Sequence, residues 1–157
     1  MYSCGLRVSE LIEIKVSDLY IDEQLLKVLG KGNKERFVPI SKIAKKLILN
    51  YIESARNHNK VERGYEDTLF INNRGQKLTR VMIYTILNNL ANHIGLKKKI
   101  SPHVLRHSFA THLIENGADI ISIQKMMGHE NIVTTEKYLH VKSKHLIDSV
   151  LKYHPRS

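Results

Sequence analysis

Apolar residues recur at helical spacing along most of this chain, which indicates a largely helical fold. In residues 42–58, for example, Ile43, Leu47 and Tyr51 fall on one face and lysines lie between them. Positions three and four residues apart share one face of a helix, so the pattern predicts an amphipathic helix here. The same spacing predicts helices in segments 5–14, 78–95, 102–115, 118–128 and 143–153, with a further helical turn or two in 134–141.

Short β-prone runs lie between the first two predicted helices. Residues 25–29 and 36–40 flank a charged segment with two glycines, which is typical of a β-hairpin with a charged tip. A further run at 68–75 predicts a short strand followed by a turn. These elements together predict an α+β fold that is mostly helical, with a small antiparallel sheet near the hairpin.

Capping residues mark the ends of two predicted helices. Thr79 is a candidate N-cap, and Gly95 stands just past the end of the same helix. The next helix is predicted to begin after Ser101 as its N-cap, with Pro102 at its first position, and to end at Gly117. In the first of these helices we expect a buried apolar stripe made of Met82, Ile83, Ile86, Leu87, Leu90 and Ile94.

The chain carries a large positive charge. Its 157 residues, 42% of them hydrophobic, fit one domain, and 25 Lys+Arg against 15 Asp+Glu give a formal net charge of +10. Such a charge favours a polyanionic partner, either nucleic acid or an anionic membrane surface. No apolar run approaches the roughly 20 residues of a spanning helix, and no secretory signal is present. We therefore expect a soluble cytoplasmic protein, in which the single cysteine, Cys4, packs as a small apolar residue.

The segment SPHVLRHSFATHLIENG, residues 101–117, gathers three histidines and an arginine on one predicted helix. His103, Arg106 and His107 project within an arc of about 100°. Two histidines four residues apart suit zinc, but a zinc site needs three or four ligands, and the arginine would repel the metal. A plain polar helix face is the second interpretation. We favour a phosphate site, because an arginine fork and histidine donors lie near a helix N-terminus.

Five motifs are spaced along the chain. They are GLRVSEL (5–11), GKGNKER (30–36), SPHVLRHSFATHL (101–113), MGHENIVTTEKYLHV (127–141) and the ending HPRS. In this order, and with the matching gap from His129 to Tyr138, they closely resemble the catalytic domain of the tyrosine recombinases, the phage integrase family, and its Xer-like members. The resemblance implies a site-specific recombinase that breaks and rejoins DNA strands through a covalent 3′-phosphotyrosyl intermediate.

The resemblance also implies the active-site residues, which are Arg7, Lys31, His103, Arg106, His129 and Tyr138. The tyrosine would be the nucleophile. A phenol with a pKa near 10 is only about 0.1% ionised at neutral pH, so a base must take its proton or the site must stabilise the phenolate. His103 resembles the family's candidate base, whereas a salt bridge from Arg7 to Glu10 on its own helix is the structural alternative for that arginine.

The remaining roles follow from the charge that develops during phosphoryl transfer. The two arginines would clamp the non-bridging oxygens, and His129 would add a hydrogen bond to them. Lys31, at the hairpin tip, resembles the general acid that protonates the departing 5′-oxygen. The resemblance therefore implies no metal and no other cofactor.

Other basic residues are expected to position DNA by contacts to its backbone. They are Lys34 and Arg36 on the hairpin, and Lys97, Lys98 and Lys99 before the phosphate helix. The remaining histidines of the motifs, His107, His112 and His140, are expected to support neighbouring residues or to lie on the surface.

The resemblance implies a longer protein and an assembly. The family carries an N-terminal helical domain ahead of the arginine motif, whereas Arg7 is the seventh residue here. We therefore expect residues 1–157 to be a catalytic domain without the core-binding domain. In the family the tail equivalent to 143–157 docks on a neighbouring recombinase, which implies a homo- or hetero-tetramer on double-stranded DNA, associated with the nucleoid.

Three other functions stay open at this point. Residues 118–141 also have the pattern of a helix-turn-helix, so the chain could be a non-catalytic DNA-binding fragment. A metal-dependent nuclease would be silenced by a chelator and would leave no covalent adduct. A type IB topoisomerase shares the tyrosine chemistry but relaxes DNA without exchanging strands.

Overall fold

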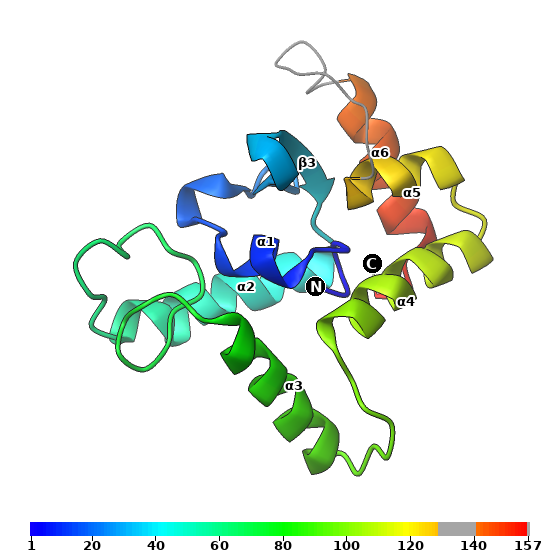
Figure 1. Ribbon diagram of the computed structural model, residues 1–157. Coiled ribbons are helices and arrows are strands. Elements are labelled where there is room, and N and C mark those ends of the chain that lie inside the picture. Colours follow the sequence, from blue (N-terminus) through cyan, green and yellow to red (C-terminus); the bar gives the residue numbers. More distant parts are fainter. Residues whose placement is uncertain (129–140, 157) are drawn as a thin grey trace.

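The computed structural model describes residues 1–128 and 141–156 of the chain (Figure 1). Its α-helices are α1 (Val8–Ile12), α2 (Lys42–Ser54), α3 (Arg80–His93), α4 (Pro102–Glu115), α5 (Ile120–Met127) and α6 (Val141–Tyr153). Short 3-10 helices are η1 (Val16–Asp18), η2 (Lys31–Asn33) and η3 (Arg56–His58), and the strands are β1 (Leu19–Tyr20), β2 (Leu25–Leu29) and β3 (Glu35–Pro39). The expected mostly helical α+β fold is confirmed. Among the helices of residues 1–128 and 141–156, none combines the length and the apolar content of a membrane span.

The sheet is antiparallel in the order β1-β2-β3, and β2 and β3 form the predicted hairpin. Leu25 pairs with Pro39 and Leu29 with Glu35, and the turn is closed by a hydrogen bond from the Gly30 amide to the Lys34 carbonyl at 2.8 Å. Gly32, at the tip, has a φ of +73°, a conformation that favours glycine. The tip is therefore a tight turn.

One apolar cluster holds the sheet to the N-terminal segment and to α2. Its buried members are Cys4, Leu6, Ile14, Leu26, Val28, Val38, Ile40 and Leu69, and Ala44, Ile48 and Ile52 of α2 pack against them. Burial of Cys4 confirms its expected packing role. The predicted strand at 68–75 is wrong, because the structure has only isolated bridges there, from Thr68 to Lys15 and from Ile71 to Lys77. The turn in this segment is confirmed by the hydrogen bond from the Gly75 amide to the Asn72 carbonyl at 2.9 Å.

A second apolar cluster joins α4, α5 and α6. It contains Phe109, Leu113, Ala118, Ile123, Met126 and Val150. Local capping explains the helix ends: Ser101 accepts a hydrogen bond from the Val104 amide, and Asp119 accepts one from the Ser122 amide. Gly128 ends α5 in the left-handed conformation.

The C-terminal helix α6 packs on its own chain. Val150 is 1% exposed in the second cluster, and α6 contacts β3, α4 and α5. The end of the helix is tied down as well, since the Asn116 side chain donates to the Tyr153 carbonyl at 2.8 Å and His154 is buried. Helix α6 therefore covers the core of its own chain.

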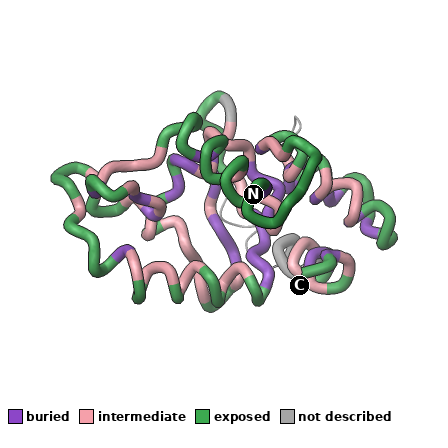
Figure 2. Tube along the Cα trace, turned by 90° about the horizontal axis from the view of Figure 1, so that it is seen from below, coloured by how far each residue is buried: buried purple, intermediate pink, exposed green. Residues whose placement is uncertain are grey.

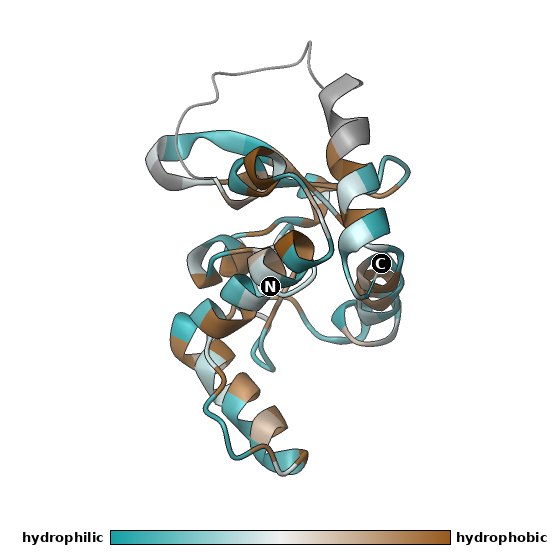
Figure 3. Ribbon diagram, turned by 90° about the vertical axis from the view of Figure 1, so that its right-hand side faces the viewer, coloured by the Kyte–Doolittle hydropathy of each residue, from teal (hydrophilic) through white to brown (hydrophobic). Residues whose placement is uncertain are grey.

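Helix α3 departs from the sequence prediction. Its bounds and its Thr79 cap are confirmed, but only Ile83 and Ala91 are buried. The expected buried stripe is wrong at Met82, Ile86, Leu90 and Ile94, which are 38%, 43%, 56% and 70% exposed. The reason is positional: α3 contacts chiefly α1 and extends away from the body of the molecule (Figure 1). Seen from below, most residues of this helix are exposed (Figure 2). Figure 3 shows that apolar residues lie along the same helix.

Candidate active site

A cleft of about 400 Å³ lies where the first turns of α3 and α4 approach α1. It is lined by Arg7, Val8, Ser9, Arg80, Pro102, His103 and Arg106. Three of the six residues expected in the active site therefore share one cleft, although they are up to 99 positions apart in the sequence (106 − 7). Two N-terminal helix ends and three arginines make this cleft attractive to an anion.

Arg106 is a buried cation with a fixed orientation. Its side chain is 9% exposed. Nη1 donates to the Gly5 carbonyl, and Nη2 donates to the Met127 carbonyl at 2.5 Å. Burial and the nearby charge of Arg7 lower the pKa of Arg106 to about 10, with Glu10 opposing the shift. Arg106 therefore stays charged at neutral pH and is already held in place before any ligand binds.

One carboxylate organises the positive charge around the cleft. The Glu10 side chain is 4% exposed, and it forms ion pairs with Arg7 at 2.9 Å, with Arg36 at 2.9 Å and with Arg106 at 3.8 Å. Burial alone would raise the pKa of Glu10, but hydrogen bonds from Arg36 and Arg7 outweigh burial and lower it. Three guanidinium groups around one carboxylate leave two positive charges without a partner inside this cluster, which favours a bound anion.

Arg7 both pairs with Glu10 and faces the cleft. Nη1 donates to Glu10 at 2.9 Å, and Nη2 reaches the Gly128 carbonyl at 3.5 Å. The side chain remains 35% exposed, so part of its guanidinium is open to a ligand. The salt bridge that was the structural alternative is thus present, and it orients the arginine at the edge of the cleft without closing it.

The structure describes the other expected catalytic residues to different extents. His103 is an exposed residue on the first turn of α4, and it lines the cleft. The backbone of Lys31 opens η2 at the hairpin tip, while its side chain is outside what the structure describes. His129 and Tyr138 lie outside the described residues. Within 1–128 and 141–156, no three His, Cys, Asp or Glu side chains are grouped as a metal site, so His103 and His107 have no third ligand there.

The expected DNA contacts fall into two classes. Lys34 is exposed on the hairpin, and Lys97, Lys98 and Lys99 are exposed in the loop between α3 and α4, as a contact to a phosphate backbone requires. Arg36 differs, because its side chain is 14% exposed and its guanidinium is bound to Glu10 and to the Met126 carbonyl. His107 is exposed, His112 bonds to the Tyr2 hydroxyl at 2.8 Å, and His140 lies outside the described residues.

Sequence reasoning assigned no role in the site to Glu10 or Arg80. Glu10 lies inside the motif GLRVSEL, three residues after Arg7, and an acidic residue so close to a candidate arginine is a usable signal. Arg80 directly follows the Thr79 cap, which places it at the open N-terminus of a helix. Neither signal indicates which other helix lies across the cleft from the residue.

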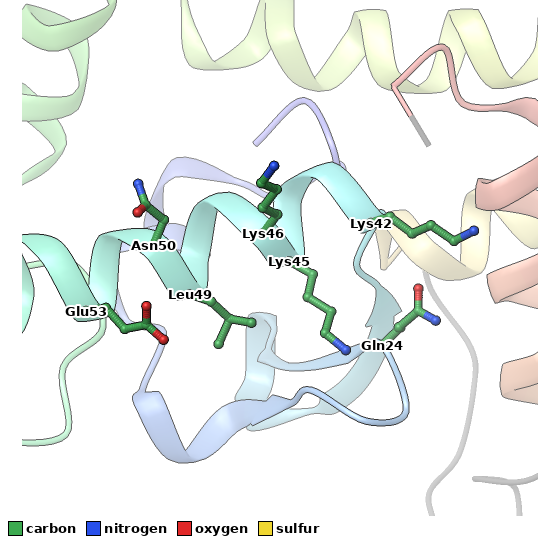
Figure 4. Close-up of a pocket in the computed structure, with 7 residues that line it drawn as sticks. All are labelled: Gln24, Lys42, Lys45, Lys46, Leu49, Asn50 and Glu53. Carbon is green, nitrogen blue, oxygen red and sulfur yellow. The ribbon is translucent and has the colours of Figure 1, made fainter.

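A second hollow, of about 510 Å³, lies on the outer face of α2 (Figure 4). It is lined by Gln24, Lys42, Lys45, Lys46, Leu49, Asn50 and Glu53. Lys45 is already bonded to the Ile21 carbonyl at 2.9 Å. This hollow contains none of the six expected catalytic residues, so we assign the site to the smaller cleft.

Known proteins resemble this chain along most or all of its length. The phage integrase family model matches residues 1–145 of the chain. Tyrosine recombinase XerD of Oceanobacillus iheyensis is 47% identical over 157 residues, which cover 100% of this chain and 53% of that protein. Tyrosine recombinase XerC of Thermodesulfovibrio yellowstonii is 44% identical over 159 residues, covering 99% of this chain and 52% of that protein. The chain thus spans about half the length of these relatives.

Solved structures show the same fold. The crystal structure of XerA recombinase matches with a TM-score of 0.74 and 34% identity, covering 98% of this chain and 55% of that one. XerH recombinase bound to its difH substrate, in a pre-cleavage complex, matches with a TM-score of 0.70 and 28% identity, covering 92% of this chain and 39% of that one.

Proposed function

This chain belongs to the phage integrase family, and from that premise we propose that it is the catalytic part of a site-specific DNA recombinase. The observation that carries the proposal is one cleft lined by Arg7, Arg106 and His103, with excess positive charge around it. The names of the relatives favour a recombinase over a topoisomerase or a binding fragment.

In the first step, the Tyr138 hydroxyl attacks a phosphodiester. His103 takes the phenolic proton, since a phenol is too weakly ionised at neutral pH to react alone. Arg7 and Arg106 bind the non-bridging oxygens, on which negative charge increases in the transition state. Because Arg106 is held by two backbone carbonyls, its reorganisation during the reaction is small.

In the second half of this step, the bond from phosphorus to the 5′-oxygen breaks. Lys31 gives its proton to that oxygen, and His129 donates a further hydrogen bond to the phosphate. The products are a 3′-phosphotyrosyl bond and a free 5′-hydroxyl. Attack by the 5′-hydroxyl of another strand reverses the step and releases the tyrosine, so the strands are rejoined without an external energy source.

Double-stranded DNA is the proposed substrate. The formal charge of +10 and the exposed lysines at 34 and 97–99 suit a phosphate backbone. The XerH neighbour is a complex with its DNA substrate. Acting on such a substrate would associate the protein with the nucleoid in the cytoplasm.

We further propose assembly into a tetramer through α6. The surface under α6, which includes Phe109, Leu113 and Met126, is apolar and fits this helix. The same surface could accept the equivalent helix of a neighbouring chain, because exchange of an identical element preserves every contact. Sedimentation of the protein with its DNA, before and after Val150→Asp, tests this: the tetramer should form only with the original α6.

A covalent adduct is the decisive test of the activity. The 157-residue chain, and a chimaera in which it replaces the matching part of the O. iheyensis protein, are incubated with EDTA and a random-sequence library of nicked duplexes. The nick lets the cleaved end diffuse away, so the adduct accumulates and its DNA can be sequenced. We expect protein joined to DNA 3′-phosphate in the presence of the chelator.

Two tyrosine substitutions serve as the test and its control. Tyr138→Phe should abolish the adduct, whereas Tyr84→Phe, on the exposed α3, should leave it unchanged. Cleavage that needs a metal and leaves no adduct would indicate a nuclease instead. No adduct with either form of the protein would overturn the proposal.

A further inference from the structure

Arg36 occupies a position that a DNA contact does not explain. Its Nη1 and Nη2 donate to the two oxygens of Glu10, each at 2.9 Å, and its Nε donates to the Met126 carbonyl at 2.8 Å. The planar guanidinium matches a carboxylate with two parallel hydrogen bonds, a geometry that lysine cannot reproduce. All three of its nitrogen atoms are therefore engaged within the protein.

These contacts join three segments that neighbour proposed catalytic residues in the sequence. Arg36 belongs to β3, the strand that leaves the hairpin tip of Lys31. Glu10, 26 residues away in sequence, also holds Arg7. The Met126 carbonyl, 90 residues away, belongs to the last turn of α5, which ends two residues before His129. One guanidinium thus connects the hairpin, α1 and the end of α5.

The end of α5 also lies in close contact with this guanidinium. Gly128 has a φ of +66°, and a Cβ added to it would lie 3.2 Å from Cζ and Nη1 of Arg36 and 3.3 Å from Nε. The chain therefore passes over the face of the guanidinium at the residue that precedes His129. Only a residue without a side chain fits there unless Arg36 moves by a few tenths of an ångström.

We propose that Arg36 is a positioning residue for strand cleavage. It fixes the Glu10 carboxylate, which in turn orients Arg7 at the cleft, and it holds the end of α5 through the Met126 carbonyl. Arg106 donates to the Gly5 and Met127 carbonyls and has only a 3.8 Å ion pair to Glu10, so Arg36 acts chiefly on the Arg7 half of the phosphate clamp. This inference rests on the proposed function and deepens it, and it replaces the DNA contact expected at this residue.

The test separates a change in chemistry from a change in DNA binding. For Arg36→Lys we measure the single-turnover rate constant of adduct formation, on duplexes trapped by the unaltered protein, and the Kd for the same DNA at several salt concentrations. A positioning role predicts a rate constant lower by about 10²-fold, as for a misplaced reacting group, with Kd and its salt dependence unchanged. Loss of a phosphate contact predicts a weaker Kd and a salt slope smaller by about 1.

Three further variants provide a comparison, a second test and a control. Lys34→Ala, on the same hairpin, should show the profile of a lost phosphate contact. Gly128→Ala should reproduce the slow chemistry of Arg36→Lys while keeping the Arg36 guanidinium, which keeps the test informative if Arg36→Lys does not fold. Gly95→Ala is its matched control, because Gly95 has a φ of +67° and a Cβ there would meet nothing within 4 Å.

Each outcome decides the question. Slow chemistry with unchanged Kd in Arg36→Lys or Gly128→Ala, and not in Gly95→Ala, supports the positioning role. Unchanged rate constants in both, or a loss confined to Kd, would overturn the role of Arg36 and leave the proposed function intact. An unaltered protein that forms no adduct would overturn the function, and with it the inference.

Discussion

Helices α3 and α4 are each 14 residues long and are both capped by a hydroxyl side chain, yet they are used in opposite ways. The α3 sequence has the clearer apolar stripe, but Leu90 and Ile94 on that stripe are 56% and 70% exposed. The α4 sequence has the weaker apolar stripe, yet its Phe109 and Leu113 are fully buried, as expected of the side opposite His103 and His107. Periodicity therefore predicts a helix, whereas burial depends on which elements lie next to it.

The two helices also differ in the arginine that each places at the cleft. Arg106 lies on the buried side of α4, three residues before Phe109, whereas Arg80 lies on the exposed first turn of α3. A buried charge is costly unless it is fully paired, so a protein that retains one at a cleft has a structural or chemical use for it. Both arginines line the cleft, but only Arg106 is held rigidly by backbone carbonyls.

The largest expected effect comes from truncating the same residue type on the two helices. Leu113→Ala on α4 should lower the free energy of unfolding by about 2–5 kcal/mol, because it removes a buried side chain and leaves a cavity. Leu90→Ala on α3 should change it by less than about 0.5 kcal/mol, since that side chain is mostly exposed. Urea unfolding of both variants measures the difference, and equal losses would contradict the contrast between the helices.

The next effect concerns the two arginines of the cleft. Arg106→Ala should slow adduct formation by about 10²- to 10³-fold, the typical result of removing one donor to a developing oxyanion. Arg80→Ala should chiefly weaken DNA binding and reduce the salt slope by about 1, as for an exposed phosphate contact. Single-turnover rate constants and salt-dependent Kd values separate the two. A rate constant in Arg106→Ala within twofold of the original would remove the buried arginine from the mechanism.

A smaller expected effect is a pH dependence of stability that arises from His154, which packs against α4. Burial lowers the pKa of His154 below its ordinary 6.5, with a hydrogen bond to the Tyr2 carbonyl opposing the shift and His112 and Arg156 adding to it. His154 packs on the ring of Phe109, with ring centroids 5.7 Å apart. The unfolded chain therefore binds this proton more readily than the folded chain does.

Stability should be complete above about pH 6.5 and should fall as the pH drops from there through the lower pKa of the folded state. His154→Gln should flatten this dependence between pH 7 and pH 5.5. The matched variant His93→Gln, at the exposed end of α3, should leave the slope unaltered. Free energies of unfolding measured across this range would refute the assignment if His154→Gln kept the original slope.

Features that depend on neighbouring residues in sequence could be predicted well. The start of α4 follows from Ser101 and Pro102, and the hairpin follows from two β-prone runs around glycines, because caps and tight turns are local. The motif resemblance also identified Arg7, His103 and Arg106, which the fold brings to one cleft.

Features that depend on distant residues could not be predicted. The buried stripe of α3 was wrong because its sequence does not say how far the helix stands from the core. The run at 68–75 is β-prone, but a strand needs a partner along its length and this segment has only single bridges. Arg36 looked like an ordinary basic hairpin residue, since its partners are 26 and 90 positions away.

The smallest expected effect tests the exposed face of α3 directly. The double variant Leu90→Glu/Ile94→Glu replaces two large apolar side chains with charges at positions that are mostly exposed. In urea unfolding at two protein concentrations, the free energy of unfolding should change by less than about 0.5 kcal/mol per site, because surface substitutions usually do. Gly95 is left in place, so the left-handed end of the helix is not disturbed. Because a buried carboxylate is strongly destabilising, a loss of several kcal/mol would mean that this face is covered in solution, and α3 would then resemble α4 after all.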